Sequence, residues 1–215
     1  MNTEENRTKK AINVHDTHRG ISDYLPKESL KDLDVVHELY AHKKTKFVLQ
    51  LLEPLLKQYH NDPYMVANIG YIFFFCDKRQ RAYDMLKQNF ELNPNNIYAQ
   101  CYFVRVCILM NKLEEAFNAF NGKLVLEELF PERTDFTVAE LSEILFSFGL
   151  FFSKVGLMKS VFYNLTQLEQ FLPPQHPYVQ ELQQELKSHG VNIQALKQEI
   201  EKQKAARLEQ ETTQE

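Results

Sequence analysis

Several features that mark common protein classes are scarce or absent in this sequence. Its 215 residues include no tryptophan, 6 glycines and 3 cysteines, and runs of β-branched residues are few. The low glycine content and the shortage of β-branched runs argue against a β-rich fold. No apolar run approaches the length of about 18 residues that a membrane-spanning helix needs. We therefore expect a helical protein that does not insert into a membrane.

Sequence signatures of catalysis are also missing. The chain has no glycine-rich phosphate loop, no nucleophile elbow and no metal-ligand spacing. His15 and His18 come nearest to a metal-binding pair, but two imidazoles without further ligands make a poor site. We predict no enzyme activity, no cofactor and no metal site. The net charge of −4 and the isoelectric point of about 6.0 give no electrostatic reason to expect nucleic-acid binding.

Cysteine use and the N-terminal sequence bear on the compartment. Cys76, Cys101 and Cys107 are odd in number and lie within helical patterns, so we interpret them as small buried hydrophobic residues rather than as a disulfide framework. The N-terminal sequence MNTEENRTKK lacks the apolar stretch of a signal peptide. Both observations predict a cytoplasmic protein.

Residues 66–94 have the apolar spacing of two short helices joined by a polar corner. Each helix carries one apolar stripe at helical spacing, and the second helix ends where a proline excludes helical geometry from the residue before it. A single hairpin of this kind cannot bury its own apolar face, so it has to stack with copies of itself. The stripe positions are Val66, Ile69, Gly70 and Phe73 in the first helix, and Ala82, Leu86 and Phe90 before Pro94 in the second.

The same offsets recur along the chain with a period of about 34 residues, and recurrence at a fixed period indicates a repeat array. One period before Gly70 lies Val36, and one period after it lies Val104. A fourth copy is centred on Gly149. Gly149 is farther from Val104 than one period, which implies an insertion between the third and fourth copies.

This order of residues resembles the tetratricopeptide repeat over about residues 30 to 175. The resemblance implies an all-α fold, a right-handed superhelix of about four tetratricopeptide-like helical hairpins with capping and C-terminal tail helices. We divide the chain into a flexible N-terminal arm (1–29), a helical repeat domain (30–189) and a polar C-terminal helix or tail (190–215). A generic array of helical hairpins is the alternative.

Local signals predict where several helices begin and end. Asp62 and Pro63 suit an N-cap and a first helical residue, and the sequence TVAE at 137–140 fits a capping box that starts a helix at Val138. Residues 113–128 suggest one long helix. Pro54 falls inside the pattern of an earlier helix and should bend or shorten it.

In tetratricopeptide arrays the first helices of the hairpins line a concave groove. The resemblance therefore implies a groove rich in tyrosine and phenylalanine, and exposed apolar surfaces of this kind usually mark binding sites. The alternative is that tight curvature buries these rings against each other. The predicted groove residues are Tyr64, Asn68, Tyr71, Phe74, Phe75, Tyr98, Tyr102, Arg105 and Leu109.

Two known modes of tetratricopeptide recognition can be compared with this groove. The clamp that grips a chaperone's C-terminal carboxylate needs fixed positive charge. Only Asn68 matches it, because the basic slots hold Leu33, Tyr98 and Tyr102, so we reject this mode. The tyrosines are more similar to those of the class II chaperones of bacterial type III secretion, which hold an extended segment of a translocator protein.

We predict a non-enzymatic scaffold that binds a protein or peptide ligand in the groove, with a type III secretion translocator chaperone as the narrower hypothesis. The alternative is a structural subunit that self-associates, for example as a homodimer, through the groove or the tail helix.

Overall fold

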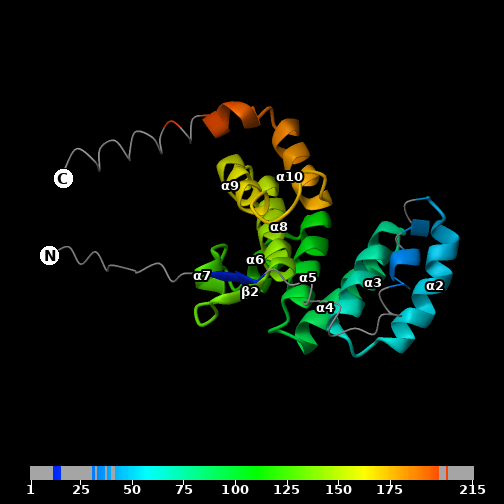
Figure 1. The fold of residues 1–215 in the computed structure, drawn as a ribbon. Helices are drawn as coiled ribbons and strands as arrows, with labels where there is room; N and C mark the ends of the chain where they lie inside the picture. The colour runs from blue at the N-terminus through cyan, green and yellow to red at the C-terminus, as the bar shows by residue number, and fades with distance from the viewer. Residues whose placement is uncertain are drawn as a thin grey trace. The chain divides into compact units, whose positions relative to one another are not determined.

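The computed structural model is built almost entirely of helices, and it describes residues 12–15, 31, 33–36, 38, 39, 42–198 and 202. Figure 1 shows their arrangement along the chain. The predicted all-α fold is confirmed. In chain order the elements are β1 (Asn13–His15), α2 (Thr45–Gln58), α3 (Pro63–Phe75), α4 (Arg79–Leu92), α5 (Ile97–Leu109), α6 (Leu113–Ala119), α7 (Leu126–Leu129), β2 (Asp135–Thr137), α8 (Val138–Lys154), α9 (Met158–Leu168) and α10 (Pro177–Ser188).

The chain separates into two compact units, Met1–Ser147 and Phe148–Glu215, and the division falls inside α8. The first unit holds α2 to α7, both strands and the start of α8. The second unit holds the end of α8, then α9, α10 and a helical stretch at 193–198. The predicted boundaries at residues 29 and 189 stay predictions, and most of the predicted arm lies outside the described residues.

The corners of the hairpins confirm the repeat. Lys43, Asp77 and Asn111 each have a positive φ, at 56°, 63° and 59°. Successive members of this set are one repeat period apart in the sequence. Gly156 and Gly190 have the same left-handed backbone, at φ 79° and 73°. Gly156 is farther from Asn111 than one period, which places the insertion between these two corners, and Gly190 follows Gly156 by one period again.

Each corner is closed by the same hydrogen bond. The residue after the left-handed one donates its backbone N–H to the carbonyl oxygen five residues earlier, the Schellman pattern that satisfies the last carbonyls of a helix. The repeat is therefore present in backbone geometry as well as in residue type. The bonds run from Lys44 to Leu39 (2.9 Å), Lys78 to Phe73 (3.0 Å), Lys112 to Cys107 (2.8 Å), Leu157 to Phe152 (2.9 Å) and Val191 to Leu186 (3.0 Å).

The corner at Gly190 belongs to a fifth hairpin, where the sequence predicts a capping helix and a separate tail. Its first helix is α10 and its second comprises residues 193–198. Asn192 caps the second helix by accepting the N–H of Ala195 at 3.1 Å. The apolar pattern of the repeat is interrupted here, because the position equivalent to Leu86 is Glu199. For this reason the sequence pattern does not indicate a fifth hairpin.

The predicted helix starts are confirmed. Asp62 accepts the N–H of Met65 at 2.9 Å, with Pro63 as the first residue of α3. Thr137 and Glu140 form the reciprocal bonds of a capping box, at 3.1 and 3.0 Å, at the start of α8. The sequence predicts that Pro54 bends or shortens its helix. It does not shorten it, because α2 continues through Pro54 to Gln58.

The single helix predicted for residues 113–128 is wrong. α6 ends at Ala119, and Asn121 and Gly122 adopt left-handed backbone angles of 54° and 71° that stop it. The short helix α7 and the strand β2 follow. β1 pairs with β2 in parallel, with Asn13 opposite Asp135. From the sequence we assign these N-terminal residues to a flexible arm, and we do not predict the strand Asn13–His15.

The first helices of the central hairpins are enclosed. Residues 65–74 are buried except for Tyr71, and every residue from 99 to 108 is buried. α3 and α4 approach closely at Gly70, because a Cβ there would lie 2.7 Å from a methyl carbon of Leu86. Helices that are buried on nearly all sides hold their side chains in fixed positions.

Candidate partner-binding surface

Aromatic rings of α3 and α5 contact each other along the two helices. Tyr64 and Tyr98, which occupy equivalent positions of successive repeats, have ring centroids 4.9 Å apart. The rings of Tyr71 and Tyr102 are 5.3 Å apart. Both pairs are edge-to-face, the geometry that the ring quadrupoles favour. At two places, therefore, a ring of α3 contacts a ring of α5.

The second of these pairs continues to the C-terminal end of α3. The Phe75 ring lies 4.9 Å from that of Tyr71 and 5.6 Å from that of Phe74. Phe75 is 45% exposed, and Leu109, at the equivalent position of α5, is 36% exposed. Tyr64, Tyr71 and Tyr98 are half-buried. We call Tyr64, Tyr71, Phe75, Tyr98 and Leu109 the aromatic surface.

Three predicted groove residues serve the packing beneath this surface. Tyr102 is buried, and its hydroxyl donates to Oδ1 of Asn68 at 3.0 Å. Asn68 is buried too, and its Nδ2 donates to the backbone oxygen of Tyr64 at 2.9 Å. Phe74 is also buried. For these three side chains the structure follows the alternative in which groove residues pack against each other.

Burial controls the ionisation of the half-buried tyrosines. It raises the pKa of Tyr64 to about 12, with a smaller contribution from the negative charge of Glu143. Burial also raises the pKa of Tyr98, and nearby carboxylates add to the shift. Both phenols therefore stay neutral at physiological pH and give the surface rigid apolar bodies with polar tips.

Arg105 lies in the interior, where its charge is neutralised. It is 1% exposed and forms an ion pair with Glu143. Its Nε donates to Oγ of Ser147 at 3.0 Å, and its guanidinium carbon lies 4.9 Å from the centre of the Tyr102 ring and 4.7 Å from that of Phe146. Arg105 therefore joins α5 to the first part of α8 and does not supply positive charge to the aromatic surface.

The sequence contains a signal for this ion pair. An arginine on a helix that is apolar nearly all round needs a carboxylate partner, and Glu143 is the acidic residue on the corresponding face of the fourth copy.

The predicted groove residues divide into those at the surface and those beneath it. Tyr64, Tyr71, Phe75, Tyr98 and Leu109 reach the surface, whereas Asn68, Phe74, Tyr102 and Arg105 lie beneath it.

The three cysteines are buried and unpaired with one another, as predicted. Burial raises the pKa of the Cys101 and Cys107 thiols to about 12 each, and it raises that of Cys76 as well.

Because only the thiolate is a good nucleophile, we expect the native chain to resist alkylation by iodoacetamide near neutral pH. Mass spectrometry should show three adducts only after unfolding in guanidinium. Rapid modification of Cys101 in the native chain would contradict its interior position.

The described ranges of the chain contain neither a metal cluster nor a membrane-spanning helix. Among their residues, no three His, Cys, Asp or Glu side chains come together in a way that could hold a metal ion. Nor does any described helix have the length and apolar character needed to cross a membrane.

Comparison with known proteins gives matches among solved structures. No family model and no curated protein matches this chain. One similar structure is titled MamA 41-end from Desulfovibrio magneticus RS-1, with 13% sequence identity and a TM-score of 0.46. The match covers 85% of this chain and 97% of that chain. The MamA RS-1 ArsTM double mutant gives 13% identity and a TM-score of 0.45, over 87% of this chain and 98% of that chain.

Proposed function

We propose that this chain is a non-enzymatic scaffold that binds a segment of a partner protein on the aromatic surface. The observation that carries the proposal is two groups of contacting rings on α3 and α5, Tyr64 with Tyr98 and Tyr71 with Tyr102 and the exposed Phe75. Tyrosine-rich surfaces held by a rigid support supply contact area at a small cost in conformational entropy. The buried network of Asn68, Tyr102 and Arg105 gives this surface such a support.

The chemistry of the surface limits the kind of segment that fits. Its five residues are uncharged, and the nearby Arg105 is paired with Glu143. A carboxylate anchor would lack a fixed cation there. We infer that the ligand is a neutral, largely apolar segment.

The narrower hypothesis is a type III secretion translocator chaperone in the cytoplasm. It is supported by Tyr64, Tyr71 and Tyr98 on the surface and by three cysteines kept as free thiols. It requires the ligand to be an extended translocator segment. Binding of purified translocator segments would separate this hypothesis from a general scaffold.

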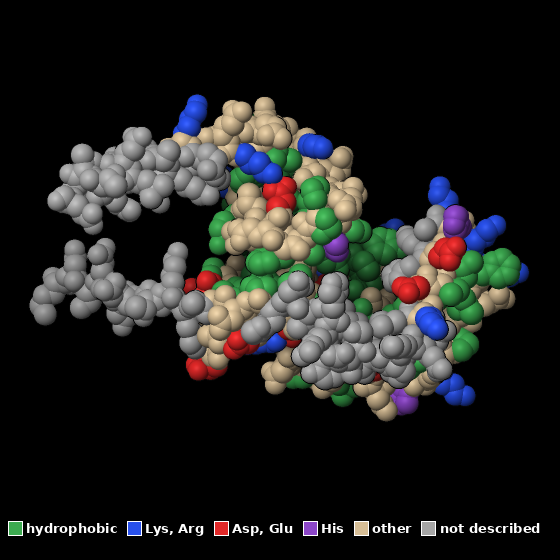
Figure 2. All heavy atoms as spheres, viewed as in Figure 1, with side chains coloured by type: hydrophobic (Ala, Val, Ile, Leu, Met, Phe, Trp, Pro, Cys, Tyr) green, Lys and Arg blue, Asp and Glu red, His purple; other side chains and the backbone are tan. Residues whose placement is uncertain are grey.

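Self-association is the second candidate, and exposed apolar residues on the first hairpin favour it. Phe47 is 57% exposed, and Val35 and Leu51 are exposed as well. Figure 2 shows hydrophobic side chains at the surface over α2. This candidate predicts a mass that rises with concentration in analytical ultracentrifugation, whereas a scaffold for another protein keeps a constant mass.

A matched pair of variants tests the aromatic surface. We expect Phe75→Ser combined with Leu109→Ser to weaken binding of a peptide selected against the wild-type chain from a displayed random library. Truncating interface anchors typically costs about 2 kcal/mol or more, which corresponds to a loss of about 30-fold in affinity. Fluorescence anisotropy with the labelled peptide measures the change.

Phe117→Ser is the control, because Phe117 on α6 is 39% exposed and lies outside the aromatic surface. It should leave the affinity unchanged, and circular dichroism should show native helicity in both variants. Equal affinity for the double variant and the wild type would contradict the proposed surface.

A further inference from the structure

The insertion between the third and fourth copies contains the strand β2, which has contacts with neighbouring residues of the same segment and of α8. Arg133 lies over the ring of Phe136, with 4.5 Å between the guanidinium carbon and the ring centre. Its Nη2 pairs with Oε2 of Glu140 at 2.7 Å, and the same carboxylate oxygen accepts the N–H of Thr137 at 3.0 Å. Phe136 is almost fully buried, and Ile12 lies beside it. The bonds of Arg133 and Thr137 to Glu140 tie β2 to the start of α8 through residues outside β1.

Residues 12–15 occupy the edge of this strand. The backbone N–H of Asn13 donates to the carbonyl oxygen of Thr134 at 2.8 Å, and the parallel register sets Asn13 opposite Asp135 and Val14 opposite Phe136. The Asn13 side chain donates to Oδ1 of Asp135 at 3.3 Å. Residues 12–15 therefore pair with β2 through backbone hydrogen bonds, as a peptide does when it adds a strand to a sheet edge.

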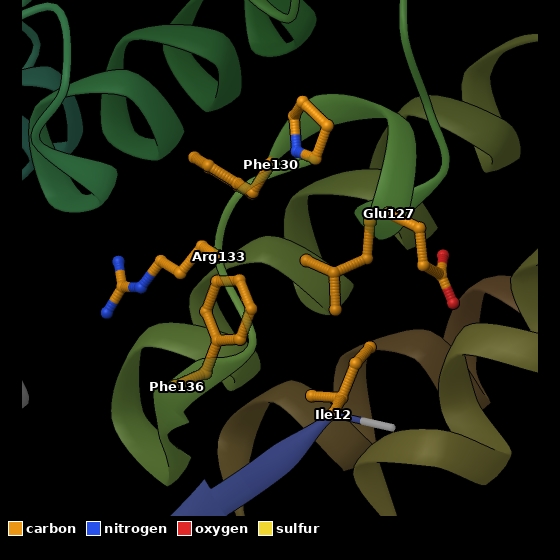
Figure 3. Close-up of a pocket in the computed structure, with 7 residues that line it drawn as sticks. Ile12, Glu127, Phe130, Arg133 and Phe136 are labelled. Carbon is orange, nitrogen blue, oxygen red and sulfur yellow. The ribbon is translucent and has the colours of Figure 1, made fainter. Parts of the chain in front are cut away.

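Ile12 is one of the residues that line a small apolar pocket beside this edge. Figure 3 shows the Ile12 side chain directed from the start of β1 toward α7, with Phe136 and Phe130 on the receiving side. Leu126 also lines the pocket, and a cavity of about 20 Å³ remains. An aliphatic residue immediately before the paired strand therefore completes the apolar wall of the pocket.

β1 is held by fewer contacts than β2 among those described above. β1 is very short, and a two-stranded sheet of that length is marginal in water. Pairing with a strand so distant in the sequence also has to overcome the entropy of closing a long loop. Such a strand should dissociate and rebind while the helices stay folded.

We propose that residues 126–137 form a strand-addition receptor, and that residues 12–15 of the same chain are its dissociable ligand. The receptor takes an extended peptide with a branched aliphatic residue at the Ile12 position and β-branched Val14 in register with Phe136. Tethering favours the same chain as the source of the ligand, because it gives residues 12–15 a high effective concentration at the receptor.

A disulfide trap in the full chain identifies the source of the strand. Asn13→Cys with Asp135→Cys places two thiols at paired positions whose native side chains are already within hydrogen-bond distance. Mild oxidation should give a cross-linked monomer on non-reducing gels, confirmed by a linked peptide in mass spectrometry. Asn13→Cys with Glu132→Cys is the control, and it should cross-link far less because residue 132 lies outside the register. The buried native thiols should take no part.

A competition experiment tests whether the strand dissociates. Ile12→Asp should release the strand and leave the receptor open, so a labelled synthetic peptide of residues 9–18 should bind this full-length variant at least about 10-fold more tightly than the wild type, because the tethered ligand no longer competes. The same peptide carrying Ile12→Asp should not bind. Oxidation of the Asn13→Cys/Asp135→Cys chain should abolish binding, and reduction should restore it.

Three results would overturn the proposal. A cross-linked dimer would show that the strand comes from a second copy. Failure of the peptide to bind the Ile12→Asp chain would show that the strand is not exchangeable. An uncross-linked monomer after oxidation would show that residues 12–15 do not pair with β2.

Discussion

Replacing Arg105 with alanine should lower the free energy of unfolding by about 3–5 kcal/mol, the usual cost of removing one partner of a buried ion pair. The variant leaves Glu143 in the interior without its countercharge, and it leaves Oγ of Ser147 without its donor. It also removes the guanidinium from between the rings of Tyr102 and Phe146. Urea unfolding followed by circular dichroism measures the loss.

Arg81→Ala is the matched control. Arg81 pairs with both oxygens of Glu53, with Nη2 and Oε2 2.8 Å apart, but both side chains are about half exposed. Exposed ion pairs contribute about 0–1 kcal/mol. A loss for Arg105→Ala no larger than that for Arg81→Ala would contradict the buried position of Arg105.

A combined change separates the charge from the packing. Arg105→Met together with Glu143→Leu should recover most of the stability lost in Arg105→Ala, because it removes both charges and fills the volume with apolar groups. Continued instability of the double variant would mean that the hydrogen bonds to Ser147 and the Glu143 backbone, rather than the ion pair, hold α8 to α5.

Replacing Leu182 with alanine should destabilise the second unit by about 2–5 kcal/mol, the range measured for buried leucine truncations. Leu182 on α10 is fully buried. A Cβ built at Gly149 would lie 2.6 Å from its Cδ1, so the leucine fills the space that the glycine leaves open. Leu157→Ala is the control, since Leu157 is mostly exposed and should change stability little.

The same contact predicts a rescue. Gly149→Ala alone should be destabilising by about 1–3 kcal/mol, because the added methyl group overlaps Leu182. Combined with Leu182→Ala, the methyl group should occupy part of the cavity, so the double variant should be more stable than Leu182→Ala alone. Additive losses in denaturant unfolding would contradict the packing of α10 against α8.

The repeat is visible in the sequence because it places small and large residues at fixed offsets. Gly70 and Ala82 are small where two helices approach closely, and the structure confirms both as packed positions. The capping residues Asp62 and Thr137 are visible for the same reason, since a cap is a local interaction between residues three apart. Local interactions of this kind leave a signal in one short stretch of sequence.

Other features are set by contacts between distant parts of the chain. β1 is a very short strand, and its partner β2 lies far along the sequence, so no local pattern marks it. Arg105 is predicted to line the groove, whereas its interior position depends on the ion pair with Glu143, which belongs to a later copy of the repeat. The fifth hairpin is recognised by the left-handed Gly190 at the repeat spacing, whereas the sequence around it also fits an ordinary helix end.

Photocrosslinking from the aromatic surface tests the central claim most directly. A benzoylphenylalanine placed at Phe75 should cross-link to a bound partner segment on irradiation, whereas the same group at Phe117 should not. Mass spectrometry of the product would identify the segment and its contact residue. Efficient cross-linking from position 117 and none from position 75 would contradict the aromatic surface as the binding site.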